Sequence, residues 1–254
     1  MIHLNLYLNL HLFKNGIRAF MYKISIVIPV LNEENFIIRI LSFFTESEHS
    51  HFEIIVSDGG SKDSSLEIAS KYNSVKVHNC NQKCRAKQMN EAVEKFATGD
   101  VYYFVHADVL PPKTWFADIQ ESLEKKSNIG GYRFRFDSTR PLLRFNSWMT
   151  RFNILSFRGG DQTIFITKDL FESLKGYNNW SIMEEYDLIK RAKESGEKYK
   201  LIQKDVLVSA RKYENNNYFK INLANLLAIL KFRLGVNHRE IKESYLRMIN
   251  HPKA

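Results

Sequence analysis

The chain has 254 residues, 44% of them hydrophobic and 26% charged, which is typical of a globular protein with one large domain. Its formal net charge is +9, but residues 211–254 hold nine Lys/Arg and three Asp/Glu, so 9 − 3 = +6 lies in this tail. A charge so concentrated argues against a protein that coats nucleic acid. No run approaches the roughly 20 apolar residues that a membrane span needs.

Residues 1–22 precede the first clear strand, and their role is open. This segment alternates Leu with polar residues and lacks the basic start and the cleavage site of a signal peptide. A second methionine, Met21, stands just before the strand. The segment is therefore an upstream start, a loose extension or an added edge strand. The pair Cys80 and Cys84 favours ordinary thiols in a reducing cytosol, so we expect a cytoplasmic protein.

Apolar strands and amphipathic helices alternate strictly in the first half of the chain. The sequence predicts strands at residues 23–30, 52–58, 75–79 and 101–108. It predicts helices at residues 31–44, 64–72, 85–99 and 113–126. This order implies an α/β fold in which a parallel sheet is covered by helices on both faces.

The second half is less regular. A strand is predicted at residues 129–136, a turn and strand at 159–167, and short strands at 200–210. Helices are predicted at residues 140–157, 181–196, 218–234 and 238–248, and a short helix with a turn at 168–178. We expect one domain over residues 23–210 and a basic helical segment over residues 211–254, packed on or beside it. The helix at 218–234 is apolar on most faces with basic ends. It closes the acceptor side, packs in the core or a dimer, or lies on an anionic membrane face.

Polar side chains follow three of the predicted parallel strands. Asn32 and Glu33 follow the first, Asp58 ends the second, and His106 and Asp108 end the fourth. Ligands bind at the carboxyl ends of the strands in such sheets. The sequence therefore predicts a binding site at this edge.

The stretch VYYFVHADVLPPKTW places a carboxylate where a buried strand ends. Two prolines follow Asp108 in the sequence and fix the turn. The side chain of Asp108 is therefore a rigidly held ligand for a cation. Mg²⁺ or Mn²⁺ binds through one or two carboxylates and completes its shell with water and phosphate oxygens. His106 is a further ligand, a phosphate donor or a structural histidine.

Four other motifs indicate chemistry. The glycines of SDGGS, Gly59 among them, let the backbone turn beside Asp58, although the next helix could also be capped there. Arg85 opens a helix, a poor place for a cation unless an anion such as diphosphate lies near it; the other reading is a solvated side chain. The loop GGDQ brings a carboxylate towards a cleft. MEEYD concentrates acids at a helix start, where a general base could sit.

Six stretches occur in the order found in family 2 glycosyltransferases: SIVIPVLNEE, VSDGGSKDSS, RAKQMN, FVHADVLPP, GGDQTIFI and MEEYDL. Over residues 23–209 the chain most resembles the subgroup called radical-SAM/selenodomain-associated transferase 2, or arsenosugar-biosynthesis-type glycosyltransferase. The resemblance implies the GT-A (Rossmann-like) fold, with a mixed, mainly parallel sheet flanked by helices and a C-terminal helical appendage. It also implies metal-assisted, inverting transfer of a sugar from a nucleoside-diphosphate sugar to a hydroxyl acceptor.

The resemblance assigns a role to individual residues. The nucleotide-sugar would contact Pro29, Asn32, Glu33, Asp58, Gly59, Arg85, His106, Ala107, Asp161 and Gln162. Asp108, with His106, would hold Mn²⁺ or Mg²⁺; the His replaces the first acid of the family's Asp-x-Asp motif, as is common in this subgroup. The family's Glu-Asp pair is here Glu184-Glu185, so Glu185 is the expected general base and Glu184 the next candidate.

Two rival functions stay open. One is a nucleotide-sugar-binding protein without turnover, which the His and the Glu pair motivate. The other is a nucleotidyltransferase on a similar fold, although PVLNEE is acidic where a basic phosphate loop would be needed. No G-x-G-x-x-G follows a strand, which argues against a dinucleotide oxidoreductase. Expected partners are the donor, a small-molecule or lipid acceptor, a second copy in a homodimer, and the inner membrane face through the C-terminal segment, but no nucleic acid.

Overall fold

The computed structural model describes residues 21–80, 82–154 and 163–249. Their strands form one eight-stranded sheet in the order β3-β2-β1-β4-β7-β6-β8-β5. The strands are β1 (Ile24–Val30), β2 (Phe52–Asp58), β3 (Val75–Asn79), β4 (Val101–Phe104), β5 (Val109–Leu110), β6 (Ile129–Phe136), β7 (Ile164–Thr167) and β8 (Lys200–Val208). Four strand pairs are parallel and three, β4–β7, β6–β7 and β5–β8, are antiparallel. The mixed, mainly parallel sheet expected from the sequence is confirmed.

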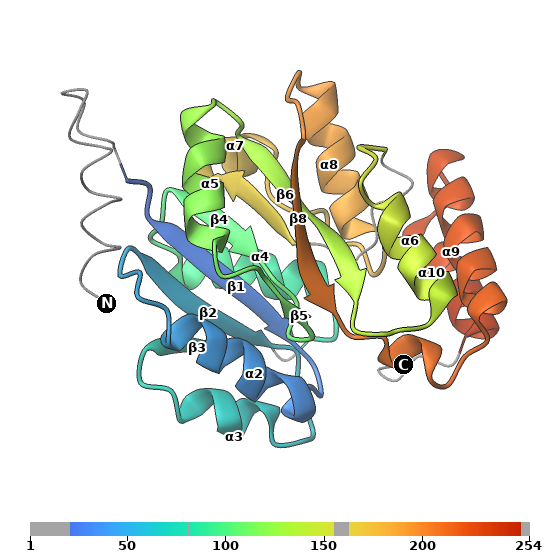
Figure 1. Cartoon of the computed structure of the whole chain (residues 1–254), viewed down its shortest axis with the longest axis horizontal. Coiled ribbons are helices and arrows are strands. Elements are labelled where there is room, and N and C mark those ends of the chain that lie inside the picture. The colour runs from blue at the N-terminus through green and yellow to red at the C-terminus, as the bar shows by residue number, and fades with distance from the viewer. Residues whose placement is uncertain (1–20, 81, 155–162, 250–254) are drawn as a thin grey trace.

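Helices flank this sheet (Figure 1). They are α2 (Glu34–Thr45), α3 (Ser65–Ser70), α4 (Arg85–Phe96), α5 (Trp115–Glu124), α6 (Pro141–Met149), α7 (Lys168–Ser173), α8 (Glu184–Glu194), the 3₁₀ helix η2 (Arg211–Tyr213), α9 (Tyr218–Arg233) and α10 (His238–Met248). The alternation of strands and helices predicted for the first half is therefore the observed one.

The central strand β1 is buried on both faces. Successive side chains of a strand point to opposite sides. Ile24, Ile26 and Ile28 accordingly pack in the cluster that contains the apolar residues of α2 and α5, whereas Val27 packs in the cluster of α4 and α8. Apolar residues are needed on both sides, which is why the strand shows a continuous apolar run.

The strand predicted over residues 101–108 is shorter in the structure. β4 ends at Phe104, and the amide of Val109 donates to the carbonyl of His106 at 3.1 Å, which closes a turn. The two residues of β5 then pair with β8 instead of continuing β4. The His-Ala-Asp motif thus lies on a turn between two strands.

The C-terminal segment shares the main core. Ile221 and Ala224 of α9 belong to the same buried cluster as β1 and α2. Farther along, Ala228 and Ile241 pack with Met183 at the start of α8. The helices α9 and α10 therefore support α8 as well as closing one end of the molecule (Figure 1). None of the helices in the described ranges is long and apolar enough to cross a membrane.

Candidate active site

The loop after β1 is tied to the loop after β2. Asn32 adopts a left-handed backbone with φ 53°, which Asn tolerates better than most residues. Its Oδ1 accepts from the amide of Lys62 at 2.8 Å, and its own amide donates to Ser61 Oγ at 2.9 Å. This double link fixes the backbone just before Glu33. Pro29 lies three residues before Asn32, where it is buried in β1 and pairs with Ser57 of β2.

Asp58 shapes the turn that follows β2. Its side chain is buried, and its Oδ2 accepts from the amides of Gly60 at 2.8 Å and Ser61 at 2.9 Å. Its Oδ1 accepts from the hydroxyl of Ser61. Both oxygens therefore organise the chain's own loop, and the role of Asp58 in binding the base or ribose stays a prediction.

Gly59 is required by close packing beneath this turn. A Cβ atom there would lie 2.7 Å from Nε2 of Gln88. That buried amide donates at 2.8 Å to the carbonyls of Val30 and Ser57, so it joins the ends of β1 and β2. A side chain at Gly59 would displace this brace, which explains the glycine without a ligand. Asp63, by contrast, accepts from the first amides of α2 and α3, as the capping interpretation expected.

A guanidinium joins the ends of β1 and β4. Glu33 is buried, and its two oxygens accept from Nη1 and Nη2 of Arg211 at 2.7 and 2.8 Å. Nη2 also donates to Oδ2 of Asp108 at 2.8 Å. The guanidinium stacks over the ring of Phe36, 4.4 Å from its centroid. The carboxylate of Glu33, the residue just before α2, therefore holds Arg211.

The acids at the start of α8 meet the other residues of the predicted site. Nε2 of His106 and Oε1 of Glu185 are 3.1 Å apart. Arg85, at the start of α4, donates through Nε to Glu184 and places Nη2 3.6 Å from Glu185. The anion that we expected near Arg85 is thus, in this structure, the chain's own carboxylate pair.

The backbone before this pair is strained. Met183 has φ 65°, a left-handed backbone conformation that is costly for residues other than Gly, Asn and Asp. The side chain packs with Tyr186, Ala228 and Ile241, which holds the backbone in place. Strained residues of this type cluster at functional sites.

The environment pushes the pKa values of the two carboxyls apart. Burial raises the pKa of Glu184 above its usual value in spite of the contact with Arg85. Burial acts in the same direction on Glu185, but the charge of Arg85 and the bond from His106 outweigh it, so the pKa of Glu185 is lowered. Each residue also has one buried Oε2 without a hydrogen-bond partner. Neighbouring acids with divergent pKa values are typical of sites where one acts as a base.

Asp108 and His106 fit a divalent cation whose other ligands are diphosphate oxygens and water. No group of three or more His, Cys, Asp and Glu in the part of the chain described here could hold a metal by itself. Asp108 and His106 nevertheless lie on one turn, each partly exposed, and offer a carboxylate and an imidazole. Such a pair suits Mn²⁺ or Mg²⁺ bound mainly by diphosphate oxygens and water.

Most of the predicted site residues lie at the carboxyl edge of the sheet. Two ion clusters lie there. In one, Arg211 joins Glu33 and Asp108; the other contains Arg85, Glu184, Glu185 and His106. Ala107 is buried on the turn between His106 and Asp108. Asp161 and Gln162 lie outside the described residues. Sequence reasoning missed Arg211; its basic tail made it look like a surface cation, and no local pattern connects it with Glu33, 178 positions away.

The family of the chain follows from its sequence. The model of glycosyl transferase family 2 matches residues 25–179, more than half of the 254 residues. The chain belongs to glycosyl transferase family 2 and is, by class, a glycosyltransferase. No curated protein matches the sequence.

Solved glycosyltransferases share the fold. The mannosyltransferase PcManGT from Pyrobaculum calidifontis, in complex with GDP-Man and Mn²⁺, gives a TM-score of 0.65 at 14% identity, with 89% of this chain and 69% of that chain covered. S. aureus TarS 1–349 in complex with UDP-GlcNAc gives 0.63 at 16%, covering 87% and 69%. Glucosyl-3-phosphoglycerate synthase from Mycobacterium tuberculosis, in complex with Mn²⁺, UDP and phosphoglyceric acid, gives 0.60 at 18%, covering 85% and 79%. These likenesses establish the GT-A fold expected from the sequence.

Proposed function

We propose that this chain transfers a sugar, with inversion, from a nucleoside-diphosphate sugar to a hydroxyl acceptor, and that it belongs to the radical-SAM/selenodomain-associated subgroup. One observation carries the proposal of turnover: Glu185 has a lowered pKa, bonds His106 through Oε1 and has a second oxygen without a hydrogen-bond partner, 3.6 Å from Nη2 of Arg85. Such a transfer needs a proton acceptor, a cluster of cations and ligands for a metal ion. Nucleotide-sugars and Mn²⁺ bound by proteins of the same fold support it.

The donor would lie across the carboxyl ends of β1, β2 and β4. The loops that hold Pro29, Asn32 and Asp58 would receive the nucleoside, and Asp161 and Gln162 the donor sugar or the acceptor. Arg85 and Arg211 would face the diphosphate, whose negative charge grows as it departs. Asp108 and His106 would hold Mn²⁺ or Mg²⁺, which would supply further stabilisation of that charge when bound.

Glu185 would take the proton from the acceptor hydroxyl as its oxygen attacks the anomeric carbon. The bond from carbon to acceptor oxygen forms on the face opposite to the breaking bond to the diphosphate oxygen, and one displacement inverts the configuration. His106 would hold the carboxylate in place through Oε1. The longer Glu in place of the family's Asp at this position shifts the carboxylate by about one bond, which selects where the acceptor must lie.

The division into an extension (1–22), a glycosyltransferase domain (23–210) and a C-terminal segment (211–254) also remains a proposal. The hydrogen bond from Arg211 to Asp108 supports a site to which the last two of these both contribute. Cytoplasmic location, a homodimer and contact with a membrane are further proposals.

Donor binding is the first test of the function. We expect UDP- or GDP-sugars to raise the melting temperature of the purified protein, more with Mn²⁺ than without, because a ligand that binds only the folded state stabilises it. Asp108→Ala should abolish the increment from Mn²⁺ and lower transfer, whereas Asp100→Ala on the opposite edge of the sheet should keep both. Binding without any transfer or hydrolysis would favour the rival function, a binding protein without turnover; no binding of any nucleotide-sugar would reject the proposal.

The pH dependence tests the part of Arg85. Because Glu185 must be ionised to act, and its pKa lies below the usual 4.5, the acid limb of the kcat/KM profile should fall below that pH. Arg85→Gln removes the cation that lowers this pKa, so the acid limb should move to higher pH. Lys87→Gln, on the solvent side of the same helix, should leave the limb unchanged. If the acid limb of the Arg85→Gln variant lay at the same pH as that of the wild type, Arg85 would have no effect on the ionisation that controls the rate.

A further inference from the structure

Two helices that are distant in sequence form one exposed apolar surface, here called the α6–α9 face. The helices lie side by side (Figure 1), joined by Asn146 Nδ2 to Asn222 Oδ1 at 3.0 Å and Tyr218 OH to Asn146 Oδ1 at 2.6 Å. The exposed apolar side chains of the face are Leu142, Phe145, Trp148, Phe152, Phe219, Leu223, Leu226, Leu227, Leu230 and Leu234. These are most of the large apolar side chains that the described residues expose, and apolar side chains gathered on two neighbouring helices mark an interaction surface.

The spacing shows that the exposure follows from helix geometry. In α9 the exposed residues recur at intervals of three and four, from Phe219 to Leu230, which places them on one side of the helix. The opposite side is already used, because Ile221, Ala224 and Ala228 are buried against the rest of the protein. The helix therefore has an apolar stripe on each side, and only one of the two packs against other residues that the structure describes.

The charge of the face selects its partner. Residues 140–154 contain three Arg and no acid, and residues 218–234 contain three Lys/Arg and no acid. The cations are Arg140, Arg144, Arg151, Lys220, Lys231 and Arg233, of which Lys231 pairs with Glu240 of α10. A two-fold dimer through this face would place like charges opposite one another. An anionic lipid surface instead offers apolar chains for the apolar residues and phosphates for the cations.

Individual side chains suit the boundary between lipid and water. Trp148 is 44% exposed, and the guanidinium of Arg151 lies 5.2 Å from its ring centroid. Trp and Arg combine an apolar body with a polar end, so both are favoured at the level of the headgroups. The pair would lie with the indole towards the acyl chains and the guanidinium towards phosphate.

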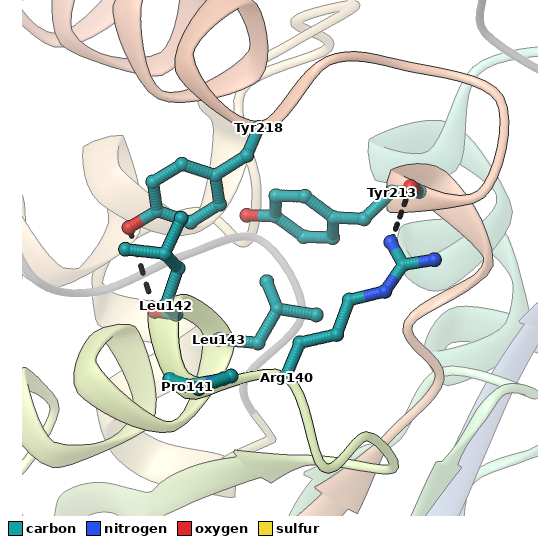
Figure 2. Close-up of a pocket in the computed structure, with 6 residues that line it drawn as sticks. All are labelled: Arg140, Pro141, Leu142, Leu143, Tyr213 and Tyr218. Carbon is teal, nitrogen blue, oxygen red and sulfur yellow. Dashed lines mark hydrogen bonds between the residues drawn. The ribbon is translucent and has the colours of Figure 1, made fainter.

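A cavity of about 230 Å³ lies at the edge of the face, between the first turns of α6 and α9 (Figure 2). Leu142, Leu143, Tyr213 and Tyr218 line it, and Arg140 closes one side by donating to the carbonyl of Tyr213 at 3.0 Å. Tyr213 belongs to η2, which also contains Arg211 of the candidate active site. The face thus adjoins the catalytic end of the molecule through three consecutive residues.

We propose that the α6–α9 face docks this protein on an anionic lipid bilayer, with α6 and α9 lying along the surface. Docking depends on the apolar residues and on the cations, and it needs neither donor nor turnover. It is therefore independent of the proposed transfer reaction. The surface also extends the contact expected for the C-terminal segment, because α6 and the residues just after it contribute four of its ten exposed apolar side chains.

The test is co-sedimentation of the full chain with vesicles of phosphatidylcholine alone or with added phosphatidylglycerol. We expect binding to the anionic vesicles, at least about tenfold weaker binding to the neutral ones, and release by salt. The variant Phe145→Glu/Leu223→Glu should lose binding and keep its thermal unfolding, because both side chains are at least half exposed. Ile38→Glu on α2, with 51% exposure close to the 50% of Leu223, is the matched control and should bind as the wild type does.

Other results would overturn the proposal. These are no binding to anionic vesicles, equal binding to neutral ones, or equal binding by the double variant and the wild type. A dimer in sedimentation equilibrium that Phe145→Glu/Leu223→Glu dissociates, together with no vesicle binding, would assign the face to a second copy of the chain. Transfer assays run in parallel without lipid would show whether the proposed reaction fails separately.

Discussion

Glu185→Gln is expected to lower the turnover of sugar transfer by about 10²–10⁴-fold and to change donor affinity little, because Gln cannot accept the proton of the acceptor hydroxyl. The amide keeps the length of the side chain and can still pair with His106, which now lies 3.1 Å from Oε1. The loss should therefore appear in the chemical step. Single-turnover transfer at saturating donor, with donor affinity measured separately, distinguishes the two effects.

Two substitutions on the same helix serve as controls. Glu184→Gln removes the neighbour whose pKa is raised, and we expect a smaller loss of turnover than for Glu185→Gln. Asp187→Asn alters an acid whose Oδ2 bonds Asn178 and Arg191 at 2.8 Å, so it should affect stability more than chemistry. If Glu184→Gln abolished turnover and Glu185→Gln did not, the base would be Glu184. Equal losses in all three would point to the packing of α8.

Local sequence was sufficient for the parallel half of the sheet. β1, β2 and β3 are separated by short helices, and each strand pairs with a strand close to it in the chain, so the alternation of patterns determines the topology. The same logic placed Asp58 and Asp108 at one edge. In the other half, β6 lies parallel to β8, and its partner shifts register between Tyr132 and Arg133. Such pairing depends on tertiary packing that periodicity does not reveal.

The site shows the same division between local and distant information. The motif residues His106 and Glu185 could be recognised one by one, and the resemblance to a family assigned both to one site; their contact across 79 positions is seen only in the structure. Asp58 accepts hydrogen bonds from the amides of its own turn. In the sequence, a carboxylate at the end of a strand fits this local role and ligand binding equally well. Arg211 could be identified only from coordinates, because a guanidinium in a basic tail has no distinctive sequence context.

Arg211→Met is expected to destabilise the protein and to weaken donor binding. Glu33 is 2% exposed, and the guanidinium provides hydrogen bonds to both of its oxygens. Removing one partner of a buried ion pair leaves an uncompensated charge and costs about 3–5 kcal/mol. For a chain of this size that corresponds to a fall of roughly 6 °C or more in melting temperature. Donor affinity should fall at least about tenfold, because Asp108 loses a cation beside the proposed diphosphate position.

The double variant Glu33→Gln/Arg211→Met separates these two effects. Gln at position 33 carries no charge, so the buried pair becomes neutral and most of the melting temperature should return. Donor affinity should remain low, because Arg211 is still absent from Asp108 and from the diphosphate. Recovery of both quantities would make Arg211 a purely structural partner of Glu33. Arg211→Lys should fall between the wild type and Arg211→Met, since an ammonium keeps the charge but cannot bond Glu33 through a planar fork while also reaching Asp108.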